Sequence, residues 1–125
     1  MKLKEPVILL AVLIVFTAHS CMQTSKVPDE LTGVWKTTDS EYTGTFLELK
    51  ADKIIIGKKG GEVDTYTIKK IKKEKVKGSE ELYFVITYID LGEKEYKFPI
   101  YFNPVDGETI RWANRPKIIW NKEIK

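Results

Sequence analysis

Histidine and cysteine are nearly absent from this 125-residue chain, which contains one of each. Both residues, His19 and Cys21, lie near the N-terminus, so every later residue is of another type. Without histidine and free thiols, that later part cannot build a Ser-His-Asp or Cys-His catalytic site, a histidine-ligated haem or a usual zinc site. We therefore predict a non-enzymatic protein that requires no metal ion and no other cofactor.

Nucleotide-binding motifs are also missing. The pair Gly60-Gly61 is not followed by Gly-Lys-Ser/Thr and stands between strand-like segments, so it predicts a hairpin turn rather than a phosphate loop. The formal net charge of +3 is too small to indicate nucleic-acid binding. Carboxylates remain for chemistry, but acidic pairs such as Glu62 with Asp64 are expected on solvated surface. A carboxylate-dependent hydrolase stays open as an alternative function.

Long hydrophobic runs are confined to the N-terminus. After Lys2 and Lys4 comes an apolar run over residues 7–16, followed by Ala18 and Ser20 just before Cys21. The run is much shorter than the roughly 20 residues that a membrane-spanning helix needs. This order of basic, apolar and small residues predicts an export signal over residues 1–20, removed by cleavage before the cysteine.

The sequence LIVFTAHSC, residues 13–21, resembles the lipobox of bacterial lipoproteins. The resemblance implies that Cys21 is acylated with a diacylglycerol and anchors the protein in the bacterial cell envelope. Because Met22 rather than aspartate follows, it also implies the outer membrane, with the domain facing the periplasm. The alternative is ordinary secretion with an unmodified thiol. Residues 21–30 are polar and include Pro28, so we expect a short, mostly extended tether there.

The rest of the chain, residues 31–125, has the composition of a β protein. Short runs rich in Val, Ile, Thr, Tyr, Phe and Trp alternate with turn signals, and no stretch has a sustained helical period. We therefore predict one all-β domain, a small antiparallel up-and-down β-barrel or strongly bent meander of about eight strands, because closure removes exposed strand edges. The turn signals are Ala51-Asp52, Gly60-Gly61, Leu91-Gly92 and Asp106-Gly107.

Alternation of side chains predicts which residues face the interior. Pro99 has no backbone N–H, so its strand is expected to be bulged or to form an edge there. The residues expected inside are mostly bulky, so we predict that they fill the barrel and leave no pocket of about 300 Å³ or more. They are Tyr96, Phe98, Ile100, Phe102, Ile110, Trp112, Ile118 and Trp120.

The start of this domain, LTGVWK, resembles the Gly-x-Trp opening of lipocalins and lipocalin-like domains, with Gly33 and Trp35 as the motif residues. The resemblance implies that Trp35 plugs one end of the barrel. It also implies that an arginine near the last strand, best matched by Arg111, packs across this tryptophan. Alternation, in contrast, points Arg111 outward if its neighbour Trp112 points inward.

The strongest charge feature is KKIKKEKVK, residues 69–77. Its lysines predict either a solvated strand that resists edge-to-edge association or a surface that contacts anionic lipid headgroups or another partner. Because Ile68 and Ile71 are three residues apart, strict alternation is broken and a bulge is expected between them. The lysines of this run are Lys69, Lys70, Lys72, Lys73, Lys75 and Lys77.

Together these observations favour a non-enzymatic cell-envelope lipoprotein whose small β-barrel is a binding or structural module. Its partner would be a protein, a glycan or a modest apolar ligand, and the lipid at Cys21 would hold it on the membrane. The size, anchor and barrel also resemble membrane-bound inhibitors of lysozyme, which implies an envelope-anchored protein inhibitor as an alternative. A further alternative is a carrier of a small apolar ligand.

Overall fold

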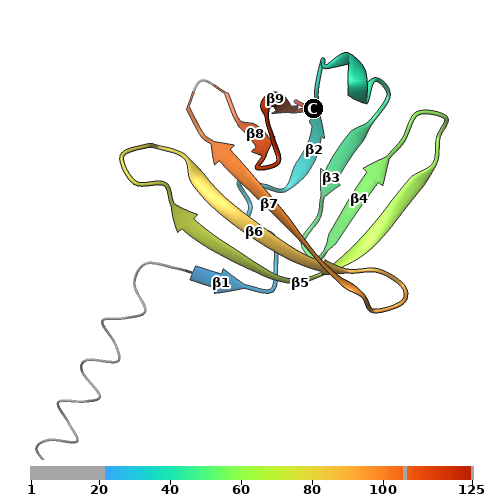
Figure 1. Ribbon diagram of the computed structural model, residues 1–125, viewed down its shortest axis with the longest axis horizontal. Coiled ribbons are helices and arrows are strands. Elements are labelled where there is room, and N and C mark those ends of the chain that lie inside the picture. The colour runs from blue at the N-terminus through green and yellow to red at the C-terminus, as the bar shows by residue number, and fades with distance from the viewer. Residues whose placement is uncertain (1–21, 106, 125) are drawn as a thin grey trace, which may run out of the picture.

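Eight consecutive strands pair antiparallel in chain order, and pairing of the first with the last closes them into a barrel (Figure 1). The structure is a computed structural model that describes residues 22–105 and 107–124. The predicted all-β up-and-down barrel is thus confirmed. Its strands are β2 (Gly33–Lys36), β3 (Phe46–Leu49), β4 (Lys53–Gly57), β5 (Val63–Lys75), β6 (Leu82–Ile89), β7 (Glu95–Asn103), β8 (Thr109–Trp112) and β9 (Arg115–Lys122).

The hairpin turns lie where the sequence predicts them. Ala51-Asp52 joins β3 to β4, and Leu91-Gly92 lies between β6 and β7. Between β4 and β5, Gly60 and Gly61 have φ angles of +99° and +93°, a left-handed conformation that glycine adopts without steric cost. The glycines in this turn are therefore required by its backbone geometry.

Strand β5 carries the predicted bulge. Its register with β6 shifts between Ile68 and Lys70, which leaves Lys69 as the extra residue. On its other edge, β5 pairs first with β4 and then with β1 (Met22–Thr24). The bulge brings both Ile68 and Ile71 into the buried core despite their spacing of three residues.

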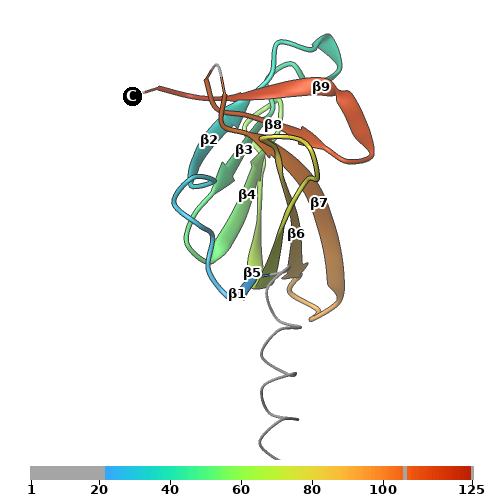
Figure 2. The ribbon, with the colours of Figure 1, turned by 90° about the vertical axis from the view of Figure 1, so that its left-hand side faces the viewer.

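Residues 22–30, predicted as a tether, instead pack on the barrel. β1 is extended as expected, but it forms an antiparallel pair with β5 in which Met22 lies opposite Lys73 (Figures 1 and 2). Val27 is buried, and its N–H donates to the carbonyl of Ala51 at 2.8 Å. The core therefore begins before residue 31. The predicted export signal and Cys21 lie outside the described residues.

A short 3-10 helix, η1 (Ser40–Tyr42), interrupts the connection between β2 and β3. Asp39 caps it, because its side chain accepts a hydrogen bond from the backbone N–H of Glu41 at 2.9 Å. The ring of Tyr42 then packs against Trp112 and Trp120, with centroids 5.2 and 5.3 Å away. Within residues 22–105 and 107–124, no helix is long and apolar enough to cross a membrane.

The two ends of the barrel differ in how completely the core is enclosed. The plugged end carries the turns after β3, β5 and β7, and residues 25–32 add the buried side chains of Val27 and Leu31 there. The open end carries the connections 37–45, 58–62, 90–94 and 113–114. Of the eight residues predicted inside, the three that are only half-buried all lie toward the open end: Tyr96, Phe98 and Trp112.

Candidate functional site

The barrel wall changes where β7 extends beyond β8. β8 pairs with β7 only over Ile100 to Asn103 of β7. One further hydrogen bond follows these pairs, from the N–H of Ala113 to the carbonyl of Pro99 at 3.0 Å. Pro99 has no N–H to return a second bond, so the ladder ends there. Residues 95–99 of β7 therefore form the edge that the proline predicts.

A hollow of about 370 Å³ lies at this edge. Its surface is mostly aliphatic and aromatic, and its volume lies in the range typical of small-molecule sites. The prediction that the barrel leaves no pocket of this size is wrong. That prediction assumed a complete wall around every inward aromatic ring, whereas the wall ends at the proline. The lining residues are Ile54, Ile56, Tyr88, Lys97, Phe98, Pro99, Trp112 and Asn114.

An aromatic cluster forms one wall of the hollow. Trp112 stacks on Trp120 with centroids 4.8 Å apart and an interplanar angle of 17°, and Phe98 meets Trp112 edge-on at 5.5 Å. Tyr42 of η1 packs against both tryptophans. These contacts on several sides hold the ring of Trp112 in a fixed orientation beside the hollow.

The indole N–H groups of this cluster lack acceptors. Nε1 of Trp112 and Nε1 of Trp120 are both buried without a hydrogen-bond partner among the described residues. The third tryptophan, Trp35 at the plugged end, donates its Nε1–H to the carbonyl of Leu31 at 3.0 Å. A buried donor without an acceptor costs about 1–3 kcal/mol, so the open end carries a polar cost that the plugged end does not.

Tyrosines line the neighbouring strands of the open end. Tyr88 stacks on Tyr96 at 5.4 Å and contacts Tyr66 at 5.0 Å. Burial, with a smaller contribution from Tyr66, raises the pKa of Tyr88. The hydroxyl of Tyr96 donates to Oδ2 of Asp90 at 3.1 Å, which raises the pKa of Tyr96. The backbone N–H of Lys94 is the main cause that lowers the pKa of Asp90.

The Gly-x-Trp motif lies at the plugged end. Trp35 is fully buried, and the ammonium of Lys122 lies 5.1 Å from the centroid of its ring. Lys122 Nζ also donates to the carbonyl of Glu30 at 2.8 Å. Gly33 has a φ angle of +141°, and a Cβ there would touch the side chain of Lys122 at 3.4 Å. Because 3.4 Å is an ordinary van der Waals distance, it is the positive φ angle rather than lack of space that favours glycine here.

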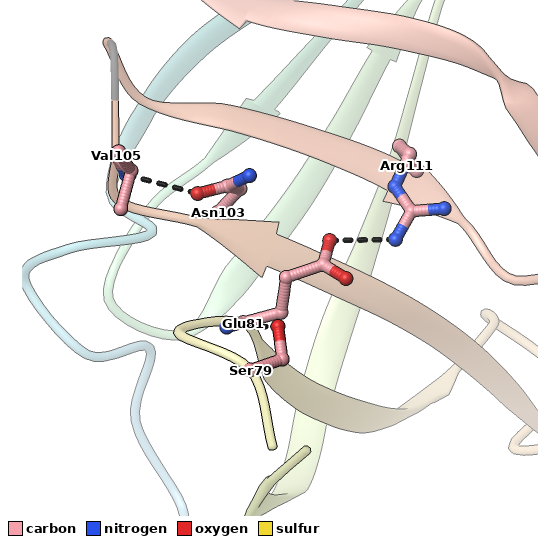
Figure 3. Close-up of polar contacts among 5 residues, drawn as sticks. All are labelled: Ser79, Glu81, Asn103, Val105 and Arg111. Atoms are coloured by element: carbon pink, nitrogen blue, oxygen red, sulfur yellow. Dashed lines mark hydrogen bonds and ion pairs between the residues drawn. The ribbon is translucent and has the colours of Figure 1, made fainter. Parts of the chain in front are cut away.

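Arg111 does not pack across Trp35, which corrects the placement implied by the lipocalin resemblance. Its guanidinium lies 4.9 Å from the centroid of Tyr101 on the outer face, and Nη2 donates to Oε2 of Glu81 at 2.6 Å (Figure 3). The N–H of Glu81 in turn donates to Oγ of Ser79 at 3.0 Å (Figure 3). Alternation therefore gives the correct side for this arginine.

Sequence reasoning missed Lys122, although a signal for it was present. Ile118 and Trp120 were predicted to point inward, and Lys122 follows with the same two-residue period. In the barrel, Lys122 lies directly opposite Trp35 across the β2–β9 pair. Extending the alternation by two residues beyond Trp120 identifies Lys122 as an inward-facing residue.

The lysines of residues 69–77 do not form one surface. Lys69 occupies the bulge, and its Nζ pairs with Oε2 of Glu95 at 2.6 Å. Lys70 lies opposite Thr87 and Lys72 opposite Val85, in register positions that alternate with the buried Ile71. These two lysines are therefore on the outer face of the barrel.

The remaining lysines of this run lie toward the plugged end. Lys73 faces inward at the rim, where its Nζ pairs with Oε1 of Glu30 at 3.0 Å. Lys75 ends β5, and Lys77 belongs to the turn that follows. Met22, opposite Lys73 in β1, brings the first described residue of the chain next to this group.

The acidic pair singled out from the sequence does not form a shared site. Asp64 pairs with Lys58 at 2.7 Å, and this contact raises the pKa of the lysine. Glu62 is exposed in the turn before β5. Among the residues that the structure describes, no group of three or more His, Cys, Asp or Glu side chains is placed to hold a metal ion.

Comparisons with known proteins yield no match. No protein-family model matches the chain, and searches of curated proteins and of solved structures find no significant match. The functional interpretation therefore depends on the geometry of the barrel and on the sequence motifs.

Proposed function

We propose that this chain is a non-enzymatic lipoprotein of the bacterial cell envelope whose barrel binds a small ligand with an apolar body at its open end. The observation that carries the proposal is the hollow of about 370 Å³ beside the β7 edge. Sites for small molecules are usually concave, mostly apolar and furnished with a few polar groups. The lining of Ile54, Ile56 and Phe98, with Asn114 as a polar residue, fits that description.

The place of β1 supports an anchor at the plugged end. Cys21, the proposed lipid attachment site, directly precedes Met22, which pairs opposite Lys73. A lipid at Cys21 would therefore hold the plugged end near the bilayer, with Lys75 and Lys77 on the same side. Each lysine close to an anionic lipid surface contributes about 1 kcal/mol of attraction. The open end would face away from the membrane, into the periplasm if the anchor is in the outer membrane.

The anchor is tested by mass spectrometry of the mature N-terminus in a bacterial host. We expect a chain that begins at Cys21 and carries acyl groups, and a Cys21→Ser variant that carries none. Fractionation of the envelope should place the lipidated protein in the outer membrane. An unmodified Cys21 thiol contradicts lipidation, and recovery in the inner membrane contradicts only the placement.

Binding is tested on the mature chain with Cys21→Ser, which removes the lipid as a competing apolar group. Every hydrogen bond and core contact described above lies within residues 22–124, so this chain is expected to fold. The uncharged fluorescent probe N-phenyl-1-naphthylamine should bind saturably at one site per chain. An Ile56→Trp substitution fills the hollow and should abolish binding, whereas Ile119→Trp, at an exposed position of β9, should leave it unchanged. Equal binding by both variants contradicts the site.

A further inference from the structure

Resting on this proposed function, we infer that the open-end site selects an acidic amphiphile, whose apolar body enters the hollow and whose carboxylate-like end accepts hydrogen bonds at its rim. The polar groups of the lining carry this inference. Lys97 and Asn114 offer N–H donors, and neither aspartate nor glutamate lines the hollow. The only formal charge on the lining is therefore positive.

The charge of Lys97 is available to a ligand. Lys97 is exposed on β7, and it forms no ion pair with any described residue. Glu95, two residues earlier on the same strand, is already paired with Lys69 at 2.6 Å. An anionic group at the rim thus gains a charge-assisted hydrogen bond that a neutral or cationic group does not.

Tyr88 is consistent with the same selectivity. It belongs to the lining, and a phenol, whose ordinary pKa is about 10, is uncharged at neutral pH and adds no negative charge. The aliphatic floor of Ile54 and Ile56 then accommodates the apolar body. The site therefore combines an apolar interior with a rim that favours acceptors.

The test compares three amphiphiles with the same twelve-carbon chain, each kept below the concentration at which it forms micelles. Dodecanoate, dodecanol and dodecyltrimethylammonium each compete with N-phenyl-1-naphthylamine on the mature Cys21→Ser chain. We expect dodecanoate to displace the probe at a concentration about tenfold lower than the cationic amphiphile, with dodecanol between them, as one charge-assisted hydrogen bond predicts.

Two variants locate the selectivity. Lys97→Met keeps the apolar stem and removes the charge, and it should abolish most of the preference for dodecanoate over dodecyltrimethylammonium. Lys50→Met, at an exposed lysine of the β3–β4 turn, is the matched control and should leave the preference for dodecanoate unchanged.

The outcomes separate this inference from the proposed function. If the probe binds but the three amphiphiles compete equally, or the cationic one competes best, the acidic class is wrong while the binding site stands. The same conclusion follows if Lys97→Met and Lys50→Met behave alike. If the probe does not bind the parent chain, and calorimetry detects no binding of dodecanoate, both the inference and the proposed function fail.

Discussion

The plugged end and the open end of the barrel use tryptophan in opposite ways. At the plugged end, Trp35 is fully buried, donates its indole N–H to Leu31 and is covered by the ammonium of Lys122. At the open end, Trp112 and Trp120 stack on each other, and neither has an acceptor for its N–H among the described residues. At the plugged end the chain thus supplies an acceptor for the buried indole N–H, whereas at the open end the described residues supply none.

The difference arises from which segments reach each end. Residues 22–32 run along the plugged end, where Val27 and Leu31 are buried and the carbonyl of Glu30 accepts from Lys122. At the open end, Phe98 of β7 and Tyr42 of η1 pack against the tryptophan pair, and Pro99 ends the adjacent ladder. We interpret the plugged end as structural, and the open end is where the ligand of the proposed function would bind.

The largest expected effect comes from removing the plug. Trp35→Ala should lower the free energy of unfolding by about 3–5 kcal/mol, because it deletes a fully buried ring and leaves a cavity. Urea denaturation of the mature Cys21→Ser chain measures the loss. A loss below about 1 kcal/mol would show that the plugged end does not depend on this side chain.

A matched pair of substitutions tests the contrast between the tryptophans directly. Trp35→Phe leaves the Leu31 carbonyl without its indole donor and should cost about 1–3 kcal/mol. Trp112→Phe removes a donor that has no partner, so it should change the free energy of unfolding by less than about 1 kcal/mol. Equal losses in urea denaturation would contradict the difference between the two ends.

The two cations near the barrel wall should also differ in importance. Lys122→Met removes a hydrogen bond to Glu30, an ion pair with Glu108 at 2.5 Å and the contact with Trp35, so we expect a loss of about 1–2 kcal/mol. Arg111→Met removes an outer-face ion pair with Glu81 and the contact with the Tyr101 ring, for which about 0.5–1 kcal/mol in total is expected. If Arg111→Met is the more destabilising in the same urea titration, the assignment of Lys122 as the covering cation is wrong.

Local features of the fold were predictable from the sequence. The spacing of Ile68 and Ile71 predicts the bulge at Lys69, and the missing N–H of Pro99 predicts the end of a ladder. Turn glycines and alternation then predict an up-and-down barrel and the outward side of Arg111. Each of these depends on a residue and its near neighbours in the chain.

Features that depend on distant pairing were missed. The packing of Met22–Thr24 on β5 joins segments about 50 residues apart, and polar composition alone gives no sign of it. The hollow was missed because its lining joins β4, β6, β7, β8 and the turn after β8, so its volume depends on how far each ladder extends. Aromatic content predicts how much side-chain volume faces inward, but not where the wall around it ends.

The smallest expected effect is a pH dependence at the open end. Burial raises the pKa of Tyr88 above the ordinary tyrosine value of 10.0, so the folded state keeps this proton when the unfolded chain loses it. The resulting contribution to stability is fully present below about pH 10 and declines as the pH rises from there through the folded-state pKa. Tyr96, whose pKa is raised mainly by its hydrogen bond to Asp90, should add a decline in the same direction.

The free energy of unfolding, measured from pH 8 to pH 11, should therefore fall less steeply for Tyr88→Phe than for the parent chain. Phenolate absorbance should show that the variant has one fewer tyrosine with a raised pKa. Dodecanoate in the hollow would bury Tyr88 further and add a negative charge. It should therefore shift the ionisation of the Tyr88 hydroxyl in the parent chain to still higher pH, and this shift should be absent in Tyr88→Phe. If the pH profile of Tyr88→Phe equals that of the parent chain, the Tyr88 hydroxyl is solvated. The open end would then lack the solvent-shielded side chain that the hollow requires there.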